Sequence, residues 1–371
     1  MTVYMAPASL LCFSHLRWNF VFQRPQHLLS RAARTMRVVF WEEAVVGEAP
    51  GLDRETTAEG VEVVRPRIPH GADPVAAERA LLDTYLRAHP MPEAVLWYYT
   101  PRALAFSGHL IGAPTVYDCM DELSAFQGAD PALPGWEQAV MRRAALVFTG
   151  GYSLYDAKKA HHPAVHAFPS GVDVAHFRPA RGALPELDAQ RAIPRPRAGF
   201  YGVLDERFDA ALLDAVAQLR PDVQFVMVGP IVKIDPASLP RRLNIHYPGP
   251  ARYDELPNLL AHWDVALMPF ALNEATRYIS PTKTPEYLAA GRPVVSTPIT
   301  DVVRQYGGTA GVQIAGDPAS FVAAIDRALA LVPGDWQPEA DRLLAGMSWD
   351  SIWDRMHAMI AEAALAEPVT A

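Results

Sequence analysis

Short apolar runs of strand length alternate with helical segments along this chain, and this alternation restricts its fold more than any other feature. Predicted strands cover residues 9–14, 37–41, 61–64, 94–99, 115–117 and 145–149, then 198–201, 223–229, 244–248, 264–270 and 293–296. Predicted helices cover residues 25–34, 74–88, 101–107, 136–143 and 152–160, then 209–219, 253–262, 284–290 and 349–363. Such alternation is typical of parallel sheets with helices on both faces. The sequence therefore predicts an α/β fold with doubly wound parallel sheets.

The chain is long enough for two domains, because 371 residues can build two separate cores. Residues 177–197 are rich in proline, alanine and arginine and have little periodicity, which is typical of a linker. We therefore expect one domain over residues 1–176 and a second over residues 198–348.

Composition disfavours several classes of protein, including nucleic-acid-binding, disulfide-rich and membrane-spanning proteins. The net charge of −8 disfavours a nucleic-acid partner, which would select a basic surface. Cys12 and Cys119 offer neither a disulfide framework nor a metal-binding spacing, so we expect a reducing cytoplasm. We expect neither a membrane-spanning segment nor a secretory signal, since no apolar run has the required length or flanks. The G-x-G-x-x-G fingerprint of NAD enzymes does not follow the first strand.

The most informative segment covers residues 268–298, where a strand end, a polar loop, a helix and another strand follow one another. The loop comes at the carboxyl end of a strand, where open α/β sheets bind ligands. Lys283 at the helix start, with neighbouring hydroxyls and helix N–H groups, suits a phosphate. Glu286 in the first turn is placed to accept hydrogen bonds from a ribose diol. The same pattern also fits a helix cap with an incidental lysine. The hydroxyl residues are Ser280, Thr282 and Thr284.

Two further residues of the second half are candidate donor contacts. Tyr247 comes at a strand end and suits packing on a nucleobase, although ordinary core packing explains it equally well. Glu274 lies in the same loop region as Ser280, where hydrogen bonds to sugar hydroxyls are expected.

The loop after the first strand predicts an acceptor or sugar contact. His15, Arg17 and Trp18 cluster at the carboxyl end of that strand. A packed loop with an exposed arginine is the alternative. We expect Trp18, Phe20 and Phe22 to be exposed. With Arg17, Arg24, Arg31 and Arg34 nearby, they also suggest peripheral contact with an anionic membrane, unless these arginines form an ordinary solvated helix face.

A second chemical cluster follows the strand at residues 115–117. Asp118, Asp121 and Glu122 repel one another, and burial would raise the pKa of at least one carboxyl, as a general base requires. We expect Asp118 to be the base that takes a proton from a hydroxyl, with Asp121 as the second choice. Acids that stabilise a helix N-terminus, or a carboxylate that only orients a substrate, are the alternatives.

Several segments together resemble a known family. ISPTKTPEYLAAGRPVVSTP looks like the donor-binding segment of GT-B glycosyltransferases, and SHLRWNFVFQRPQHLLSRAAR resembles bacterial members that build envelope glycans. With YGVLDERFDAALL and VYDCMDELSAF, the likeness covers nearly the whole chain. In sequence, the chain is similar to the glycosyltransferase 4-like group. Its Ser-x-x-Lys arrangement, Ser280 to Lys283, is similar to that of xanthan-type glucuronosyltransferases.

The resemblance implies a GT-B fold, with two Rossmann-like domains facing a cleft. The first domain would bind the acceptor and the second the nucleotide sugar, while a C-terminal helix over residues 349–371 would pack back on the first. In the family pattern, a glycine at Gly202 precedes an arginine and then a lysine that hold the diphosphate. Here Val203 replaces the arginine and Arg207 approximates the lysine. Tyr278 stands where a first glutamate is usual, so the retaining pattern is incomplete and inversion is slightly favoured.

The resemblance implies a glycosyltransferase that moves a sugar from a nucleotide-diphosphate sugar to a hydroxyl acceptor, in glycan or cell-envelope polysaccharide synthesis. A UDP-sugar is the first expectation for the donor, with guanosine and thymidine left open, and no metal or other cofactor is required. The acceptor would be a glycan, a lipid-linked sugar or a small molecule. The protein would be cytoplasmic or peripheral on the inner face of the cell membrane. A nucleotide-sugar epimerase and a non-catalytic subunit of a glycan assembly complex are the rival interpretations.

Overall fold

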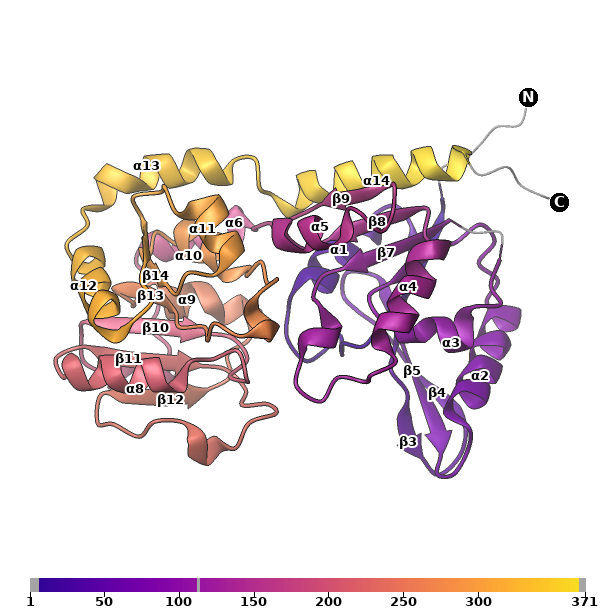
Figure 1. The fold of residues 1–371 in the computed structure, drawn as a ribbon, viewed down its shortest axis with the longest axis horizontal. Helices are drawn as coiled ribbons and strands as arrows, with labels where there is room; N and C mark the ends of the chain where they lie inside the picture. Colours follow the sequence, from indigo (N-terminus) through magenta and orange to yellow (C-terminus); the bar gives the residue numbers. More distant parts are fainter. Residues whose placement is uncertain (1–6, 112–113, 367–371) are drawn as a thin grey trace. The chain divides into compact units, whose positions relative to one another are not determined.

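The structure, a computed structural model, describes residues 7–111 and 114–366. The chain folds into two compact α/β units (Figure 1). Unit 1 contains residues up to 124, residues 128–169 and the segment that begins at Trp349, and unit 2 contains residues 125–127 and 170–348. The sequence had placed the end of the first domain at residue 176, seven residues beyond Pro169.

Unit 1 is built on one large sheet whose order is β3-β5-β2-β1-β6-β7-β8-β9. β4 is antiparallel to β5, and the other neighbouring pairs are parallel. β1 lies at the centre, with Cys12 opposite Phe40 on one side and Trp97 on the other. The strands are β1 (Ser9–Ser14), β2 (Arg37–Glu42), β3 (Val45–Gly47), β4 (Gly51–Thr56), β5 (Val61–Pro69), β6 (Val95–Tyr98), β7 (Thr115–Cys119), β8 (Leu146–Thr149) and β9 (Val165–Ala167).

Helices cover this sheet, and the last helix of the chain is one of them (Figure 1). α14 (Trp349–Ala366) packs on α1 (Arg24–Ala32), where the rings of Trp349 and His27 stack with centroids 4.6 Å apart. Arg31 Nη2 donates to Asp350 Oδ2 at 2.9 Å across the same contact. The remaining helices near this sheet are α2 (Pro74–Ala88), η1 (Pro101–Ala103), α3 (Leu104–Ser107), η2 (Leu123–Ala125), α4 (Leu133–Arg143) and α5 (Tyr152–Lys158).

Unit 2 has a smaller sheet that is parallel throughout, in the order β12-β11-β10-β13-β14-β15. Its strands are β10 (Arg197–Tyr201), β11 (Gln224–Val228), β12 (Ile245–Gly249), β13 (Val265–Met268), β14 (Val294–Ser296) and β15 (Val312–Ile314). Its helices are α6 (Val174–Phe177), η3 (Arg178–Arg181), α7 (Asp188–Arg191), α8 (Ala210–Leu219), η4 (Pro236–Ser238), η5 (Tyr253–Glu255), α9 (Leu256–Leu260), η6 (Glu274–Thr276), α10 (Lys283–Ala289), α11 (Thr300–Tyr306), α12 (Pro318–Leu329) and α13 (Pro333–Leu344). The predicted α/β class with parallel sheets is confirmed.

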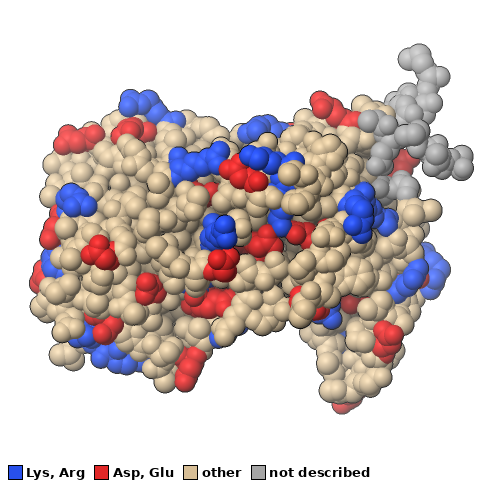
Figure 2. Space-filling view, viewed as in Figure 1, with Lys and Arg blue, Asp and Glu red and all other residues tan. Residues whose placement is uncertain are grey.

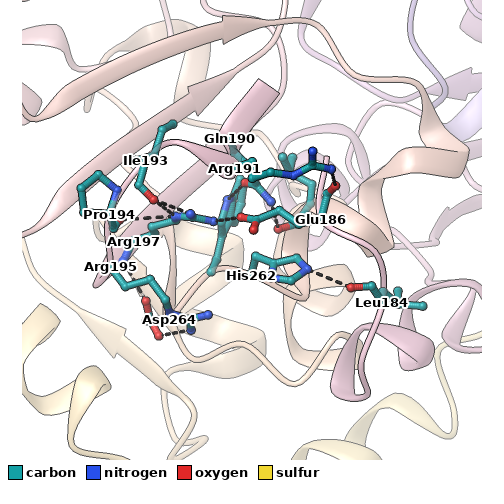
Figure 3. A network of polar contacts seen from close by, with 12 residues as sticks. Leu184, Glu186, Gln190, Arg191, Ile193, Pro194, Arg195, Arg197, His262 and Asp264 are labelled. Carbon is teal, nitrogen blue, oxygen red and sulfur yellow. Dashed lines mark hydrogen bonds and ion pairs between the residues drawn. The ribbon is translucent and has the colours of Figure 1, made fainter. Parts of the chain in front are cut away.

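The segment expected to be a linker, residues 177–197, is instead fixed to unit 2 (Figure 3). Arg197 Nε donates to the carbonyl of Ile193 at 2.8 Å, and its guanidinium pairs with Glu186. Trp263 Nε1 donates to Gln190 Oε1 at 3.0 Å. The low periodicity of the segment hid these contacts, because they are made by single side chains rather than by an apolar face.

Each sheet has one strand where successive connections change direction. In unit 1 the chain passes from β1 to β2 on one side and later returns to β6 on the other; in unit 2, β10 has β11 on one side and β13 on the other. The carboxyl ends of strands at such a point are where open α/β sheets bind ligands.

The surface that Figure 2 draws carries acidic and basic side chains interspersed with each other. Within residues 7–111 and 114–366, no helix has both the length and the apolar character needed to cross a membrane.

Candidate active site

Three glycines leave bare backbone at the carboxyl ends of adjacent strands in unit 2. Gly202 follows β10, Gly229 follows β11 and Gly249 ends β12, with φ of +142°, +149° and +91°. A side chain is disfavoured at such φ values. Gly202 and Gly229 are also in close contact, since a Cβ added to Gly229 would lie 1.8 Å from the Gly202 carbonyl oxygen. Gly229 therefore allows the ends of β10 and β11 to meet closely, while Gly249 has open space where its Cβ would lie.

We call Gly202, Gly229 and Gly249 the glycine edge. Lys283, the first residue of α10, lies beside Gly202 in this edge. A Cβ on Gly202 would lie 2.4 Å from Lys283 Cε and 2.9 Å from its Nζ. The ammonium is 5.6 Å from the ring centroid of Phe200 and 5.9 Å from that of Phe270. These rings hold the side chain near the ends of β10 and β13, where the connections change direction. The geometry places a cation beside bare backbone, which suits a diphosphate.

Glu286 lies one turn further along α10 and is buried. Its Oε2 accepts a hydrogen bond from the hydroxyl of Tyr201, the last residue of β10. Burial raises the pKa of the Glu286 carboxyl to about 7, and the Tyr201 hydrogen bond and the Lys283 charge limit the rise. Tyr287 supports this arrangement, because its hydroxyl accepts from the Tyr201 N–H at 3.2 Å.

The three predicted hydroxyl residues have different environments. Thr284 is fully buried, and its hydroxyl donates to Met268 Sδ at 2.9 Å, so it joins α10 to β13. Ser280 is partly exposed, and its Oγ accepts from Gln305 Nε2 at 3.4 Å. Thr282 directly precedes α10 and is partly exposed. The structure thus brings Lys283 together with Gly202 and Glu286, while Thr284 serves packing.

Arg207 and Glu274, two other predicted donor contacts, each lie beside an opposite charge. Arg207 donates to Asp205 through Nε and Nη2, at distances of 2.7 to 3.1 Å. Glu274 is exposed, with its Oε2 3.5 Å from Arg277 Nη1. Asp205 therefore offsets the charge that Arg207 would offer to a phosphate.

Tyr247 contacts residues of the segment that precedes β12. Its hydroxyl donates to the carbonyl of Pro240 at 3.1 Å, and Arg241 lies 5.4 Å from its ring centroid. Both residues precede β12, so these contacts lie toward the amino end of the strand. A nucleobase role for Tyr247 stays a prediction that these contacts do not support.

In unit 1, Asp118 is buried in an ion pair. Its carboxylate accepts hydrogen bonds from Arg24 Nε and Nη2 at 2.9 to 3.1 Å, and neither side chain is more than 3% exposed. Burial raises the pKa of Asp118, and the Arg24 guanidinium opposes that rise. Arg24 Nη1 also donates to the carbonyl of Phe168 at 2.8 Å, so the pair joins α1, β7 and the segment after β9. Asp121, by contrast, is partly exposed.

The loop after β1 is more buried than its sequence suggested. Trp18 is 8% exposed and packs edge-on against Phe40, which corrects the expectation of an exposed tryptophan. The buried Glu42 carboxylate accepts from the Trp18 N–H at 2.8 Å and from Arg17 Nη1 at 3.1 Å. His15 is partly exposed.

The surface proposed for membrane contact is correspondingly smaller. Arg24 and Arg31 are buried, as is Trp18. Phe20 and Phe22 remain exposed, at 51% and 37%. The sequence could not reveal this, because Asp118 and Asp350, the partners of the two arginines, come from distant parts of the chain.

Sequence reasoning missed Tyr201 and Gly229. Tyr201 directly precedes Gly202 at the end of a predicted strand, so its position was a usable signal. The close approach of Gly229 to Gly202 gave no comparable signal, since it depends on the pairing of β10 with β11.

Comparison with known proteins agrees with this architecture. Residues 195–330 match the family model of group 1 glycosyl transferases. A Bacillus subtilis (strain 168) protein named as a teichuronic acid biosynthesis glycosyltransferase, TuaH, is 26% identical over 251 residues, and the match spans 63% of this chain and 63% of that relative.

Solved structures show the same fold across the chain. A sucrose-phosphate synthase from Thermosynechococcus elongatus has a TM-score of 0.72 at 15% identity, covering 97% of this chain and 100% of that one. An E. coli trehalose-6-phosphate structure bound with UDP-2-fluoro glucose has a TM-score of 0.67 at 11% identity, covering 97% and 100%. Residues 195–330 therefore resemble the group 1 glycosyl transferases in sequence, and the chain has the fold of the GT-B glycosyltransferases.

Proposed function

We propose that this protein is a glycosyltransferase that moves a sugar from a nucleotide-diphosphate sugar to a hydroxyl acceptor. The observation that carries the proposal is the position of Lys283, which lies across Gly202 in the segment that matches the group 1 family. When the glycosidic bond to the diphosphate breaks, negative charge grows on the leaving oxygen. A preorganised cation beside bare backbone stabilises that charge.

UDP is the proposed nucleotide of the donor. The support comes from a structural neighbour that is bound with UDP-2-fluoro glucose. Glu286 is proposed to contact the ribose, and its hydrogen bond from Tyr201 would fix the orientation of its carboxyl.

Cell-envelope polysaccharide synthesis is the proposed setting, because the Bacillus relative is named for teichuronic acid biosynthesis. The acceptor would be a growing glycan or a lipid-linked sugar.

Peripheral membrane contact stays a prediction that now depends on Phe20 and Phe22. Failure of the protein to float with anionic vesicles would contradict it.

In an inverting transfer, the acceptor oxygen forms a bond to the anomeric carbon while the bond to the diphosphate breaks, and a base takes the hydroxyl proton. We propose Asp121 ahead of Asp118 for this base, reversing the order expected from sequence. Asp118 accepts from Arg24 in a buried pair, whereas Asp121 is partly exposed. His15 and Arg17 are kept as proposed acceptor contacts. The configuration of the product, read from the anomeric proton coupling in NMR, tests whether transfer inverts.

Binding of UDP measured by thermal shift tests the proposal most directly. UDP at 100 times its dissociation constant should stabilise the wild-type protein by about 2.7 kcal/mol. Lys283→Ala should weaken binding roughly tenfold to a hundredfold, because a charge-assisted hydrogen bond contributes about 1.5 to 3 kcal/mol. Lys159→Ala, which removes an exposed lysine of unit 1, is the matched control. Equal UDP binding by wild type and Lys283→Ala would contradict the proposed donor site. Isomerised donor in the absence of any acceptor would favour an epimerase instead.

A further inference from the structure

The helix that carries Lys283 and Glu286, α10, is held at both ends by side chains from one short segment, residues 170–181. This segment begins the longer stretch of unit 2 and contains α6 and η3. Both α6 and α13 pack against α10 (Figure 1). We call residues 170–181 the clamp segment.

Ser170 fixes the loop that leads into α10. Its Oγ donates to the main-chain carbonyl of Ser280 at 2.8 Å, and Ser170 is only 8% exposed. Ser280 lies in the loop directly before Lys283, and its own Oγ accepts from Gln305 Nε2 at 3.4 Å. The loop is therefore held through its main chain by Ser170 and through a side chain by α11.

Arg181 fixes the other end of α10. The last carbonyls of a helix have no partner within the helix, and a basic side chain beside them also offsets the helix dipole. Arg181 Nε donates to the carbonyl of Ala289 at 2.9 Å, and its Nη2 donates to that of Leu288 at 3.0 Å. The Asp341 carboxylate on α13 accepts from the same guanidinium at 2.7 and 2.9 Å, which orients it toward the helix end.

Gly291 makes room for Arg181 beside the end of α10. Its φ is +72°, and a Cβ at this position would lie 2.8 Å from Arg181 Cγ and 2.7 Å from Gln337 Nε2. A glycine just after a helix is common because it adopts this backbone conformation without strain. Here the missing side chain also permits the close approach of the guanidinium stem.

The clamp segment is itself fixed within unit 2. The Val172 N–H donates to the carbonyl of Met347 at 2.9 Å. The His176 ring stacks on that of Tyr253 with centroids 4.2 Å apart, and Asp173 Oδ1 accepts from the His176 N–H at 3.2 Å. The hydrogen bonds to α10 therefore come from a segment that has anchors of its own.

We propose that Ser170 and Arg181 are positioning residues that hold Lys283 at Gly202 by fixing the two ends of α10. This helix has only seven residues, about 10 Å in length, so a displacement of either end moves the Lys283 side chain. The stabilisation that an ammonium gives a diphosphate depends on its exact distance. The identification of that ligand as a nucleotide diphosphate rests on the proposed function.

NMR of the full-length protein, with ¹³C at the ε-carbon of lysine, tests the position of Lys283 without any ligand. Its ammonium lies 5.6 Å from the ring centroid of Phe200 and 5.9 Å from that of Phe270, so ring currents should displace its ε signals from the usual lysine position. Lys283→Arg identifies these signals. Few others are expected, because the lysines of this chain are Lys158, Lys159, Lys233 and Lys283.

Two variants release the ends of α10. Ser170→Ala removes the hydrogen bond to the loop before the helix, and Arg181→Ala removes those to its last carbonyls. In each folded variant, the Lys283 signals should move toward the usual lysine position. Ser170→Ala deletes a single oxygen, so it keeps the proposal testable if Arg181→Ala does not fold. Circular dichroism and melting establish which variants fold.

Two matched controls remove similar groups elsewhere in unit 2. Ser238→Ala deletes an exposed hydroxyl that also donates to a main-chain carbonyl, at 2.6 Å. Arg178→Ala deletes a guanidinium that pairs with the same Asp341, at 3.1 Å, and donates to no carbonyl of α10 in the part of the chain that the structure describes. Both controls should leave the Lys283 signals at their wild-type position.

UDP binding, measured by isothermal titration, tests whether the clamp segment acts through Lys283. Ser170→Ala and Arg181→Ala should each weaken binding about threefold to tenfold, as expected for the loss of a hydrogen bond that supports the site. In a Lys283→Ala background, the same substitutions should weaken binding less than about twofold, because the group that they position is gone. A general loosening of unit 2 would weaken binding equally in both backgrounds.

The proposal is overturned if the Lys283 signals keep their wild-type position in either folded variant, Ser170→Ala or Arg181→Ala. It is also overturned if these substitutions weaken UDP binding equally with and without Lys283. The NMR result does not depend on UDP, so it separates this failure from failure of the proposed function. Displaced Lys283 signals in a protein that does not bind UDP would support the clamp and reject the proposed donor site. UDP binding with undisplaced signals would reject only the clamp.

Discussion

At the scale of single residues, Glu286 combines deep burial with a titration near neutral pH. Its pKa is raised from 4.5 to about 7, chiefly by burial. A carboxyl whose pKa is higher in the folded than in the unfolded state binds more protons when folded. Its stabilising contribution is therefore complete below about pH 4.5 and is lost as pH rises through about 7.

Glu286→Gln should remove this pH dependence. Between pH 4.5 and 8, the free energy of unfolding of the wild type should fall relative to that of the variant by up to about 3 kcal/mol, from a pKa difference of about 2.5 units. Urea unfolding of both proteins across this range measures the difference. A difference that stays constant with pH would mean that Glu286 does not titrate there.

The buried pair of Arg24 and Asp118 gives a second prediction. Asp118→Asn leaves the Arg24 guanidinium buried without its counter-charge, which should cost about 3 to 5 kcal/mol of stability. Asp121→Asn, at a partly exposed position, should change stability by less than about 0.5 kcal/mol. Chemical denaturation measures both, and transfer assays on the same proteins compare their catalytic roles. An Asp118→Asn protein of wild-type stability with no transfer activity would restore Asp118 as the preferred base.

At the scale of elements, two factors determine which side chains the glycine edge of unit 2 tolerates. One is the positive φ of each glycine, and the other is the space available where its Cβ would lie. Gly202→Ala introduces a Cβ at φ +142° and 2.4 Å from Lys283 Cε. Gly249→Ala introduces the same atom at φ +91° with nothing within 4 Å. Both should lose about 1 to 3 kcal/mol of stability through backbone strain.

Only Gly202→Ala should also displace the Lys283 side chain, so we expect it to weaken UDP binding about tenfold more than Gly249→Ala does. Isothermal titration of both folded variants measures this ratio. Equal losses would indicate that the strained backbone, and not the position of Lys283, controls binding.

Elements with a strong apolar pattern were predictable from the sequence. Residues 9–14 and 74–88 coincide with β1 and α2, since one is a continuous apolar run and the other begins at a proline. β4 (Gly51–Thr56) was missed because its side chains are exposed or partly exposed and it pairs with β5 alone. A strand of this kind has no apolar face for the sequence to reveal.

The candidate site was predictable where one segment carries it and hidden where distant segments meet. The phosphate role of Lys283 was proposed from its local motif, but its contact with Gly202 joins residues 81 positions apart, 283 − 202 = 81. The same holds for Asp118, which was predicted as the base from its local cluster, whereas its partner Arg24, 94 positions away, was not predicted. Charge pairing across elements depends on packing, which a local pattern does not encode.

At the scale of the whole molecule, the chain crosses between its two units more than once, because α14 returns to unit 1 after unit 2 is complete. α14 contributes Trp349, Ile352, Trp353, Met356 and Ile360 to the core around β1 and β6, and each is at most 6% exposed. At about 1.5 to 3 kcal/mol for each buried side chain, these five provide about 8 to 15 kcal/mol as an upper estimate. That is comparable to the entire stability of a typical domain.

Deletion of residues 349–371 should therefore unfold unit 1 and leave unit 2 folded. Hydrogen exchange followed by mass spectrometry reports on each unit separately. Amides of β1 and β2 in unit 1 should lose protection, while those of β10 and β13 in unit 2 should keep it. Trp353→Ala should cost about 3 to 5 kcal/mol in the same region, and Glu362→Ala, at an exposed position of α14, less than about 0.5 kcal/mol. Retained protection of β1 after the deletion would show that unit 1 forms its core without the helix. In that case the residues before 170 would fold independently of the C-terminal segment, and the sequence expectation of a discontinuous first domain would lose its energetic basis.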